Sequence, residues 1–264
     1  MFSMNSIKRK RNRKLRSWVK LALVFVCFAV IGCVFCLHDN SKKEEQDLTV
    51  KLELEEQSKA QIFEIKNPYY TLNDYQAINP YVFGMLIFED ESITRRIPVV
   101  EAKSETMADY WMSHNVFNEA DSLGSAFLDA QTPLNQGNNY RINGHASYAN
   151  SRMFTFVQKY KDQQYFQNNP TFNFEDNLGT SRYEVIFMAN YDVSQEIAYG
   201  AYWLNNQLSK ENVMQLLQMD EKQIIHQREV NLATDGKYIT LVTCDMNNEN
   251  YRYVLFAHEI ERKL

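Results

Sequence analysis

The sequence predicts a mainly β domain, a closed or nearly closed barrel of about eight short strands with inserted helices. Three observations favour this fold. After residue 80 the chain divides into short segments rich in β-branched and aromatic residues, each bounded by turn formers. Tyrosine and phenylalanine, 16 of each, are abundant and there are only five prolines, which is typical of a packed β-rich domain rather than disorder. Roughly 200 residues follow the charged N-terminal part, enough for one domain with a sizeable core.

The N-terminus predicts a membrane anchor. Residues 1–20 contain eight Lys and Arg side chains and no acid, and residues 21–37 contain no charge. Trp18 and Val19 extend the apolar stretch, which is then just long enough to span a bilayer core of ~30 Å. A cleaved signal peptide is the alternative, but the apolar run is longer than usual for one, and no small-residue cleavage site follows. We expect a cytoplasmic segment 1–20, a transmembrane signal-anchor at 21–37 and an extracellular remainder, held at the cell membrane.

The cysteines divide between these parts. Cys27, Cys33 and Cys36 fall in the apolar stretch, where they act as small apolar residues. The expected extracellular part therefore holds one thiol, Cys244. A single leftover thiol in an exported domain indicates intermolecular pairing or a reactive cysteine.

The charge balance excludes one class of partner. The first 37 residues hold eight of the 28 basic side chains and none of the 33 acidic ones, so the remainder has 20 basic and 33 acidic side chains, a net charge of −13. Phosphate binding needs clustered Lys and Arg, so we expect no nucleic-acid partner.

Helical patterns are few. Residues 38–66 are charge-rich and predict a stalk running into a helix of modest amphipathicity, and the extracellular domain is expected over 67–264. A short helix is expected at 72–77, before Asn-Pro breaks the chain. Residues 151–170 have apolar residues at helical spacing up to Pro170. A last helix is expected at 208–219, with Ser209 as its N-cap.

The strands follow from composition and turn formers. They are expected at 82–88, 93–102, 124–130, 139–144, 182–193, 237–244 and 251–260. The segment 109–117 predicts a helix or a packed loop. The last two strands are joined by DMNNEN, whose Asn and acidic residues are good turn formers, so they are expected to form an antiparallel hairpin.

The hairpin register gives Cys244 a neighbour. A turn centred on Asn248 places Arg252 directly opposite Cys244, with both side chains on the same face. A slip of one residue would move Arg252 to the other face. A guanidinium there favours the thiolate, which is the nucleophile, and can donate hydrogen bonds to an oxyanion. Asp245 opposes thiolate formation. The alternative is a surface Arg252 that pairs with Glu249 or Asp245.

A thiol that transfers acyl groups also needs a proton carrier, usually a histidine. Of the five histidines, we favour His145, which follows a strand and a glycine in a small polar loop. The others have plainer interpretations: His38 lies at the membrane exit, His114 is a structural hydrogen-bonding residue, His226 lies in a polar stretch and His258 packs in the last strand.

Competing chemistries lack their motifs. No two histidines have the spacing of a helical zinc site, and no cysteine pair exists outside the apolar stretch. There is no G-x-S-x-G and no phosphate loop. A papain-like peptidase has its cysteine before its histidine, the reverse of the order here. We therefore expect no metal and no cofactor.

Residues 240–244, TLVTC, resemble the T-L-x-T-C signature of sortases, the membrane-anchored cysteine transpeptidases of Gram-positive bacteria. The order of His, signature and Arg resembles the family's triad, and NGHAS takes the place of its G-H loop. The similarity is greatest to class B: RIPVVEAKSETMADYWMSHNVF, GSAFLD and GHASYANSRMF resemble its P-V-V-Q…Y-L-N-H-N-F, G-x-I-F-x-D and G-H-N-M…M-F. The helix at 208–219 matches a class B helix in the same connection. The resemblance covers about residues 68–260.

The resemblance implies a sortase-like barrel and a mechanism without cofactors. Cys244 attacks a backbone carbonyl in the C-terminal sorting signal of a secreted protein and forms a thioester. His145 is general acid for the leaving amine and later base for the incoming one, and Arg252 stabilises the oxyanion or aligns the substrate. The acyl group passes to an amine, such as that of a peptidoglycan cross-bridge, which anchors the protein to the cell wall.

Two departures from class B concern specificity. Val242 stands where class B members often have Ser, and Ala-Ser follows His145 where Asn-Met is common. The sorting motif is therefore expected to differ from the usual one. Val242 and Asp245 flank the nucleophile and are candidates for substrate contact.

Three other functions stay open from the sequence. Some class B members join pilin subunits through a lysine amine and have the same triad. A non-catalytic barrel could bind surface proteins or wall polymers. A hydrolytic cysteine peptidase would cleave at a rate that ignores added amines.

Overall fold

The computed structural model describes residues 70–90, 93–147, 152–193, 205–218, 223–233 and 236–263. The expected anchor at 21–37 and stalk at 38–66 lie outside these ranges. Within them, no helix has both the length and the apolar character needed to cross a bilayer.

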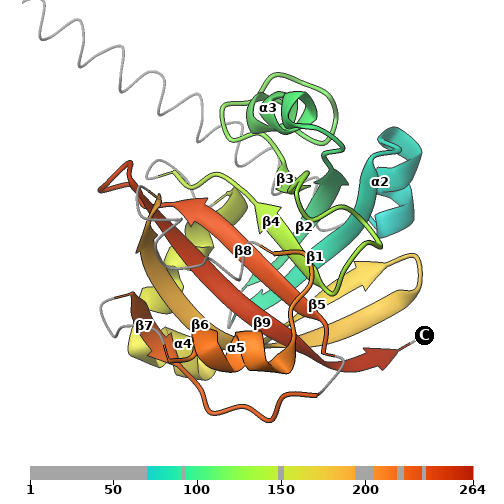
Figure 1. Ribbon diagram of the computed structural model, residues 1–264. Helices are drawn as coiled ribbons and strands as arrows, with labels where there is room; N and C mark the ends of the chain where they lie inside the picture. Colours follow the sequence, from blue (N-terminus) through green and yellow to red (C-terminus); the bar gives the residue numbers. More distant parts are fainter. Residues whose placement is uncertain are drawn as a thin grey trace, which may run out of the picture. The chain divides into compact units, whose positions relative to one another are not determined.

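Eight strands form a closed barrel (Figure 1). Their order is β5-β1-β2-β3-β4-β8-β9-β6, and β5 pairs again with β6 to complete the circle. The fold class expected from the sequence is confirmed. The bounds of these strands are β1 Val82–Asp90, β2 Ile93–Glu101, β3 Ala126–Leu128, β4 Asn139–Asn143, β5 Thr171–Asp176, β6 Gly179–Asp192, β8 Tyr238–Cys244 and β9 Tyr251–Lys263.

The pairing directions determine which strand ends meet. Neighbours pair antiparallel except β2 with β3 and β4 with β8, which are parallel. A ninth strand, β7 (Ile224–Gln227), pairs with β6 beyond the part of β6 that pairs with β5. Because β4 and β8 are parallel, their carboxyl ends lie at the same end of the barrel.

The described helices are short, and the four α-helices among them begin at side-chain caps. They are α2 Leu72–Ile78, α3 Glu105–Ser113, the 3₁₀ helix η2 Met153–Lys161, α4 Gln163–Asn168 and α5 Lys210–Leu216. The side-chain oxygen of Ser209 caps α5 by accepting a hydrogen bond from the backbone N–H of Asn212, and the side-chain oxygen of Asn212 accepts one from the backbone N–H of Ser209. The N-cap expected from the sequence is confirmed.

Some expectations need correction. The single helical pattern at 151–170 is two helices, because Asp162 is extended and caps α4. The strand at 124–130 is only three residues long, and 109–117 belongs in part to α3. Neither β5 nor β7 was expected. The first was missed because its alternating Phe172 and Phe174 are flanked so closely by turn formers that the segment reads as a loop.

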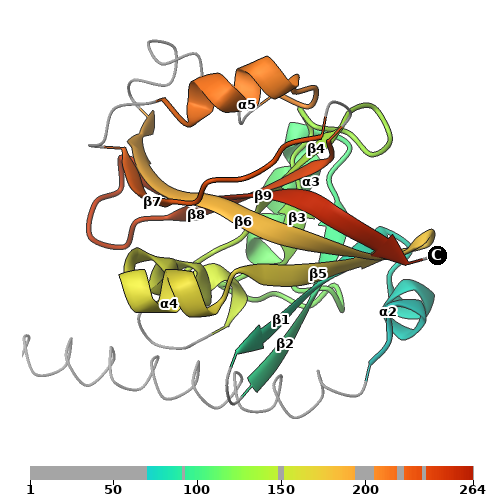
Figure 2. The same cartoon turned by 90° about the horizontal axis from the view of Figure 1, so that it is seen from below.

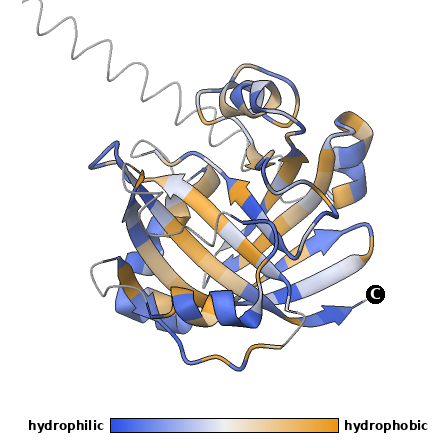
Figure 3. Ribbon diagram, viewed as in Figure 1, coloured by the Kyte–Doolittle hydropathy of each residue, from blue (hydrophilic) through white to orange (hydrophobic). Residues whose placement is uncertain are grey.

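The core has an inner and an outer layer. Aromatic residues of η2 and α4, among them Phe154, Phe156 and Phe166, pack inside the barrel with the inward side chains of the strands. Val213 and Leu216 of α5 pack on the outer face of β6, β8 and β9. Figure 2 shows α4 and α5 on opposite sides of these strands, and in Figure 3 the hydrophobic colour follows β8 and β9. Each fully buried Phe contributes about 1.5–3 kcal/mol.

Candidate active site

The ends of three neighbouring strands bring the expected site residues together. The register between β4 and β8 ends at the pair Asn143–Val242. Cys244 is the last residue of β8, and His145 lies two residues beyond β4. Arg252 is the second residue of β9, which runs antiparallel to β8 on its other side.

Arg252 lies directly opposite Cys244, as the hairpin register predicted. The backbone N–H of Asp245 donates to the carbonyl of Tyr251, 3.0 Å away, so these two form a hydrogen-bonded pair. Cys244 and Arg252 are therefore a non-hydrogen-bonded pair, the kind in which opposite side chains come closest. The thiol is half-buried and forms no disulfide among the described residues.

The guanidinium of Arg252 is anchored at one end. Its Nη1 donates to the backbone carbonyls of Glu249, at 2.7 Å, and Tyr251, at 2.9 Å. In the described part of the chain it forms no ion pair, so the alternative pairing with a carboxylate of Glu249 or Asp245 is not seen. The donors on Nε and Nη2 have no partner within the described residues and remain available to a ligand.

His145 is held by helix α3. Its Nε2 lies 3.1 Å from the backbone carbonyl of Met112. A carbonyl only accepts, so Nε2 carries a proton and Nδ1 is the nitrogen left for proton exchange. No hydrogen bond joins His145 to Cys244 among the residues described. In unliganded sites such bonds are often long and form only with substrate.

His145, Cys244 and Arg252 line one pocket of about 260 Å³. Its wall includes residues of α3 and the ends of β3, β4 and β8. The lining residues are Glu105, Ala108, Asp109, Met112, Phe127, Asp129, Asn143, Gly144, His145, Val242, Thr243, Cys244 and Arg252. A thiol, an imidazole and a guanidinium thus share one cavity, and these are the groups that acyl transfer through a thiol needs.

The two expected substrate contacts differ in position. Val242 lines the pocket beside the thiol. Asp245 does not, because its carboxylate accepts hydrogen bonds from the Asn247 backbone, at 2.9 Å, and from Asn190, at 3.1 Å. Burial alone would raise the pKa of Asp245, but these bonds and one from Tyr253 hold it below its usual value.

The other described histidines lie outside the pocket. His114 stacks on Tyr110, with ring centroids 4.0 Å apart. His226 contacts the backbone carbonyl of Lys161, and His258 contacts the carboxylate of Glu184. Their interpretation as structural residues agrees with these contacts.

Sequence reasoning missed two polar residues that line the same pocket as His145. Asp129 forms an ion pair with Arg141, at 2.5 Å, and accepts a hydrogen bond from Asn143, at 2.8 Å. Asp129 and Asn143 both line the pocket. The signal was present in GSAFLD, where an acid ends a strand, but nothing in the sequence placed that acid beside the end of another strand.

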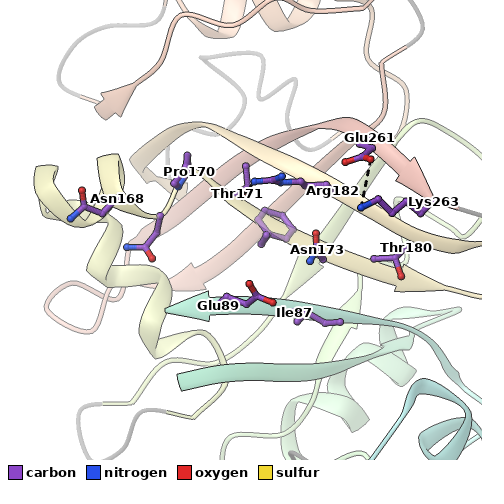
Figure 4. A pocket seen from close by; sticks show the side chains of 12 residues that line it. Ile87, Glu89, Asn168, Pro170, Thr171, Asn173, Thr180, Arg182, Glu261 and Lys263 are labelled. Carbon is purple, nitrogen blue, oxygen red and sulfur yellow. Dashed lines mark hydrogen bonds and ion pairs between the residues drawn. The ribbon is translucent and has the colours of Figure 1, made fainter. Parts of the chain in front are cut away.

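A larger pocket, of about 340 Å³, lies elsewhere on the barrel (Figure 4). Polar side chains of β5, β6 and β9, including Asn173, Arg182 and Glu261, make up part of its lining, together with apolar ones such as Ile87. Lys263 pairs with Glu261 at 3.7 Å. It contains no cysteine, histidine or serine among its lining residues. Of these two pockets, both lined by residues that the structure describes, we assign the chemistry to the smaller one because it contains both a thiol and an imidazole.

The sequence matches the Sortase domain family over residues 91–260. The chain is also similar to Sortase B of Listeria monocytogenes. The two are 28% identical over 180 residues, which cover 67% of this chain and 68% of that protein.

Solved structures show the same fold. Sortase B of Clostridium perfringens superposes with a TM-score of 0.60 at 23% identity, over 72% of this chain and 100% of that one. A Streptococcus pyogenes class B sortase involved in pilus biogenesis gives 0.59 at 17% identity, over 72% of this chain and 98% of that one.

Proposed function

Because the chain belongs to the sortase family, we propose that it is a cysteine transpeptidase of the class B type. Its substrate is a secreted protein with a C-terminal sorting signal. Its products are the released C-terminal fragment and the rest of that protein, joined by a new amide to an amine of the cell wall. The observation that carries this proposal is that His145, Cys244 and Arg252 line one pocket at the ends of three adjacent strands.

In the first half-reaction the Cys244 thiolate attacks the carbonyl carbon of the scissile peptide bond. The free N–H groups of Arg252 donate to the oxyanion that forms or align the peptide. The C–N bond then breaks, and His145 gives a proton to the leaving amine. The acyl part of the substrate stays on Cys244 as a thioester.

In the second half-reaction an amine attacks the thioester carbonyl. His145 accepts a proton from the incoming nitrogen, the C–S bond breaks and the thiolate of Cys244 is restored. Atoms and charge balance without metal or cofactor. The proposed location follows from the N-terminal sequence: a single-pass anchor at 21–37 holds the barrel on the outer face of the membrane, where secreted proteins and wall amines meet.

The first experiment uses the full chain in detergent micelles. It is incubated with a pool of C-terminal sorting-signal peptides, with and without a glycine oligomer as amine, and its intact mass is measured. We expect an acyl adduct that maps to Cys244 and is released by the amine as an amide-capped peptide. The adduct is absent in Cys244→Ala and retained in Cys33→Ala, which removes a different thiol.

Two results would contradict the proposal. Release of free acid at a rate that ignores added amine would instead indicate a hydrolytic peptidase. If iodoacetamide labels Cys244 completely and no peptide does, a non-catalytic binding domain is favoured. This conclusion requires a peptide pool that covers the C-terminal sorting motifs of exported proteins.

A second candidate is pilin polymerisation. It is favoured by the fold similarity to the Streptococcus pyogenes enzyme whose role is in pilus biogenesis. The two functions share both half-reactions and differ in the amine. A folded protein that presents a lysine would resolve the thioester faster than a glycine oligomer at equal concentration in a polymerase, and slower in a wall-anchoring enzyme.

A further inference from the structure

Helix η2 contacts the main chain of both His145 and Cys244. The backbone N–H of Phe154 donates to the carbonyl of His145 at 2.9 Å. The side-chain amide of Gln158 donates from Nε2 to the carbonyl of Cys244 at 3.3 Å. One short element therefore spans the gap between the proposed proton carrier and the proposed nucleophile.

The carbonyl of Cys244 needs such a partner because β8 extends beyond the end of β4. Asp245 pairs with β9 through its N–H, so the main-chain groups of the preceding residue, Cys244, point to the β4 side. There the carbonyl of Val242 accepts from the N–H of Gly144 at 3.1 Å, which is the last bond of the parallel ladder. The next carbonyl along this edge is that of Cys244, and Gln158 takes the place of the missing strand.

The chain leaves the β4–β8 ladder because η2 holds it. A Cβ on Gly144 would lie 2.7 Å from Cδ2 of Phe154, so only glycine permits this approach to a fully buried ring. The N–H of Ser147 donates to Oγ1 of Thr155 at 2.9 Å. The start of the loop after β4 is thus bound to η2 by both backbone and side chain, and His145 lies within it.

We infer that Gln158 is a positioning residue that holds the main chain of Cys244 in place relative to His145. The half-buried amide completes the hydrogen bonding of the nucleophile's own peptide unit without lining the pocket. In this role it acts through Cys244 and touches no substrate. The inference rests on the proposed function, because the rate of acyl transfer is the quantity that shows how well Cys244 is positioned.

The test is made in the full chain. It replaces the amide donor of Gln158 by side chains of similar length, one neutral and without a donor and one a hydrogen-bond acceptor. Gln158→Met removes the donor, and Gln158→Glu turns a carboxylate oxygen toward the carbonyl of Cys244. Lys159→Met is the matched control, since Lys159 is exposed on the same helix and pairs with Asp90 at 3.1 Å. The single-turnover acylation rate of Cys244 and the peptide concentration for half-maximal rate are measured.

We expect the maximal acylation rate to fall about 10-fold in Gln158→Met and about 100-fold in Gln158→Glu, because small displacements of reacting groups have effects of this size. The half-saturating peptide concentration changes less than twofold, and Lys159→Met behaves as the wild type. Rates within twofold of wild type in both Gln158 variants would overturn the inference. So would a higher half-saturating concentration at unchanged maximal rate, which would make Gln158 a substrate contact.

Failure of the proposed function gives a different result. If no peptide acylates the wild type, the same variants are compared by the rate at which iodoacetamide alkylates Cys244, which depends on the groups around the thiol. We then expect at least a threefold change in Gln158→Met and Gln158→Glu and none in Lys159→Met. Equal alkylation rates in all four proteins would overturn the inference independently of any substrate.

Discussion

The guanidinium of Arg252 uses one nitrogen to bond the protein backbone and leaves the others for the pocket. One nitrogen donates to the carbonyl of Glu249 in the β8–β9 loop and to that of Tyr251, the first residue of β9, and the others have no partner within the described residues. The position opposite Cys244 could be predicted, because a two-strand hairpin with a defined turn centre fixes every cross-strand pair. The hydrogen bond between His145 and the backbone carbonyl of Met112 could not be predicted, because it joins a helix and a loop that no local sequence pattern relates.

Arg252→Ala is expected to lower the acylation rate about 10²–10³-fold, which is the usual effect of losing one oxyanion donor. Arg252→Lys should recover only part of the rate, because an ammonium lacks the planar fork. Stopped-flow acylation with a labelled sorting peptide measures both. Arg182→Ala, an exposed arginine of the larger pocket, is the control. A rate for Arg252→Ala within threefold of wild type would remove Arg252 from the mechanism.

Among the elements, the β8–β9 connection is joined to the end of β6 by the carboxylate of Asp245, which complements the backbone hydrogen bond from Val193 to Asn250. Asp245 accepts from Asn247 within the loop and from Asn190 at the end of β6. The sequence predicted this hairpin and its turn. It did not predict β5, since Thr171–Asp176 is too short and too close to turn formers for its alternation to stand out. It also merged η2 with α4, because the apolar spacing continues across the break at Asp162.

The hydrogen bonds of Asp245 predict that the free energy of unfolding depends on pH. The pKa of Asp245 is held below its usual value of 3.8, despite burial, by hydrogen bonds to the ionised form. A lowered pKa in the folded state contributes stability that is fully present above pH 3.8 and is lost as the pH falls through the folded-state value. Asp245→Asn should therefore lower the free energy of unfolding by about 2 kcal/mol near neutral pH, and by less in acid.

Urea unfolding of the full chain in detergent at a series of pH values from neutral to acid measures this difference. The exposed Glu229→Gln is the control and should show little change at any pH. A difference between wild type and Asp245→Asn that stays constant across this range would contradict the linkage.

At the scale of the whole molecule, the barrel closes through aromatic contacts between β1, β5 and β6. Phe172 of β5 stacks on Phe88 of β1, with centroids 4.6 Å apart, and on Tyr183 of β6, at 5.6 Å. The closed barrel was predictable from the number of strand-like segments. The strand that closes it was not, because pairing of β5 with both β1 and β6 is a tertiary relation.

Phe172→Ala is expected to lower the free energy of unfolding by about 3–5 kcal/mol, the usual cost of emptying a buried aromatic site. Circular dichroism during urea unfolding measures it. Leu178→Ala, at an exposed residue in the β5–β6 turn, should change the free energy by less than about 0.5 kcal/mol. Equal effects of the two substitutions would mean that β5 does not contribute to closure.

The parallel pairing of β4 with β8 has a consequence for the order of events during folding. Between these strands the described residues include β5, β6, β7 and three helices, so the pairing of β4 with β8 is a contact of high sequence separation. Such contacts form slowly, because a long loop must close before they contribute. His145 and Cys244 meet only when this pairing is complete. A partly folded chain therefore has the thiol without its proposed proton carrier, and the proposed acyl transfer becomes possible only as these strands join.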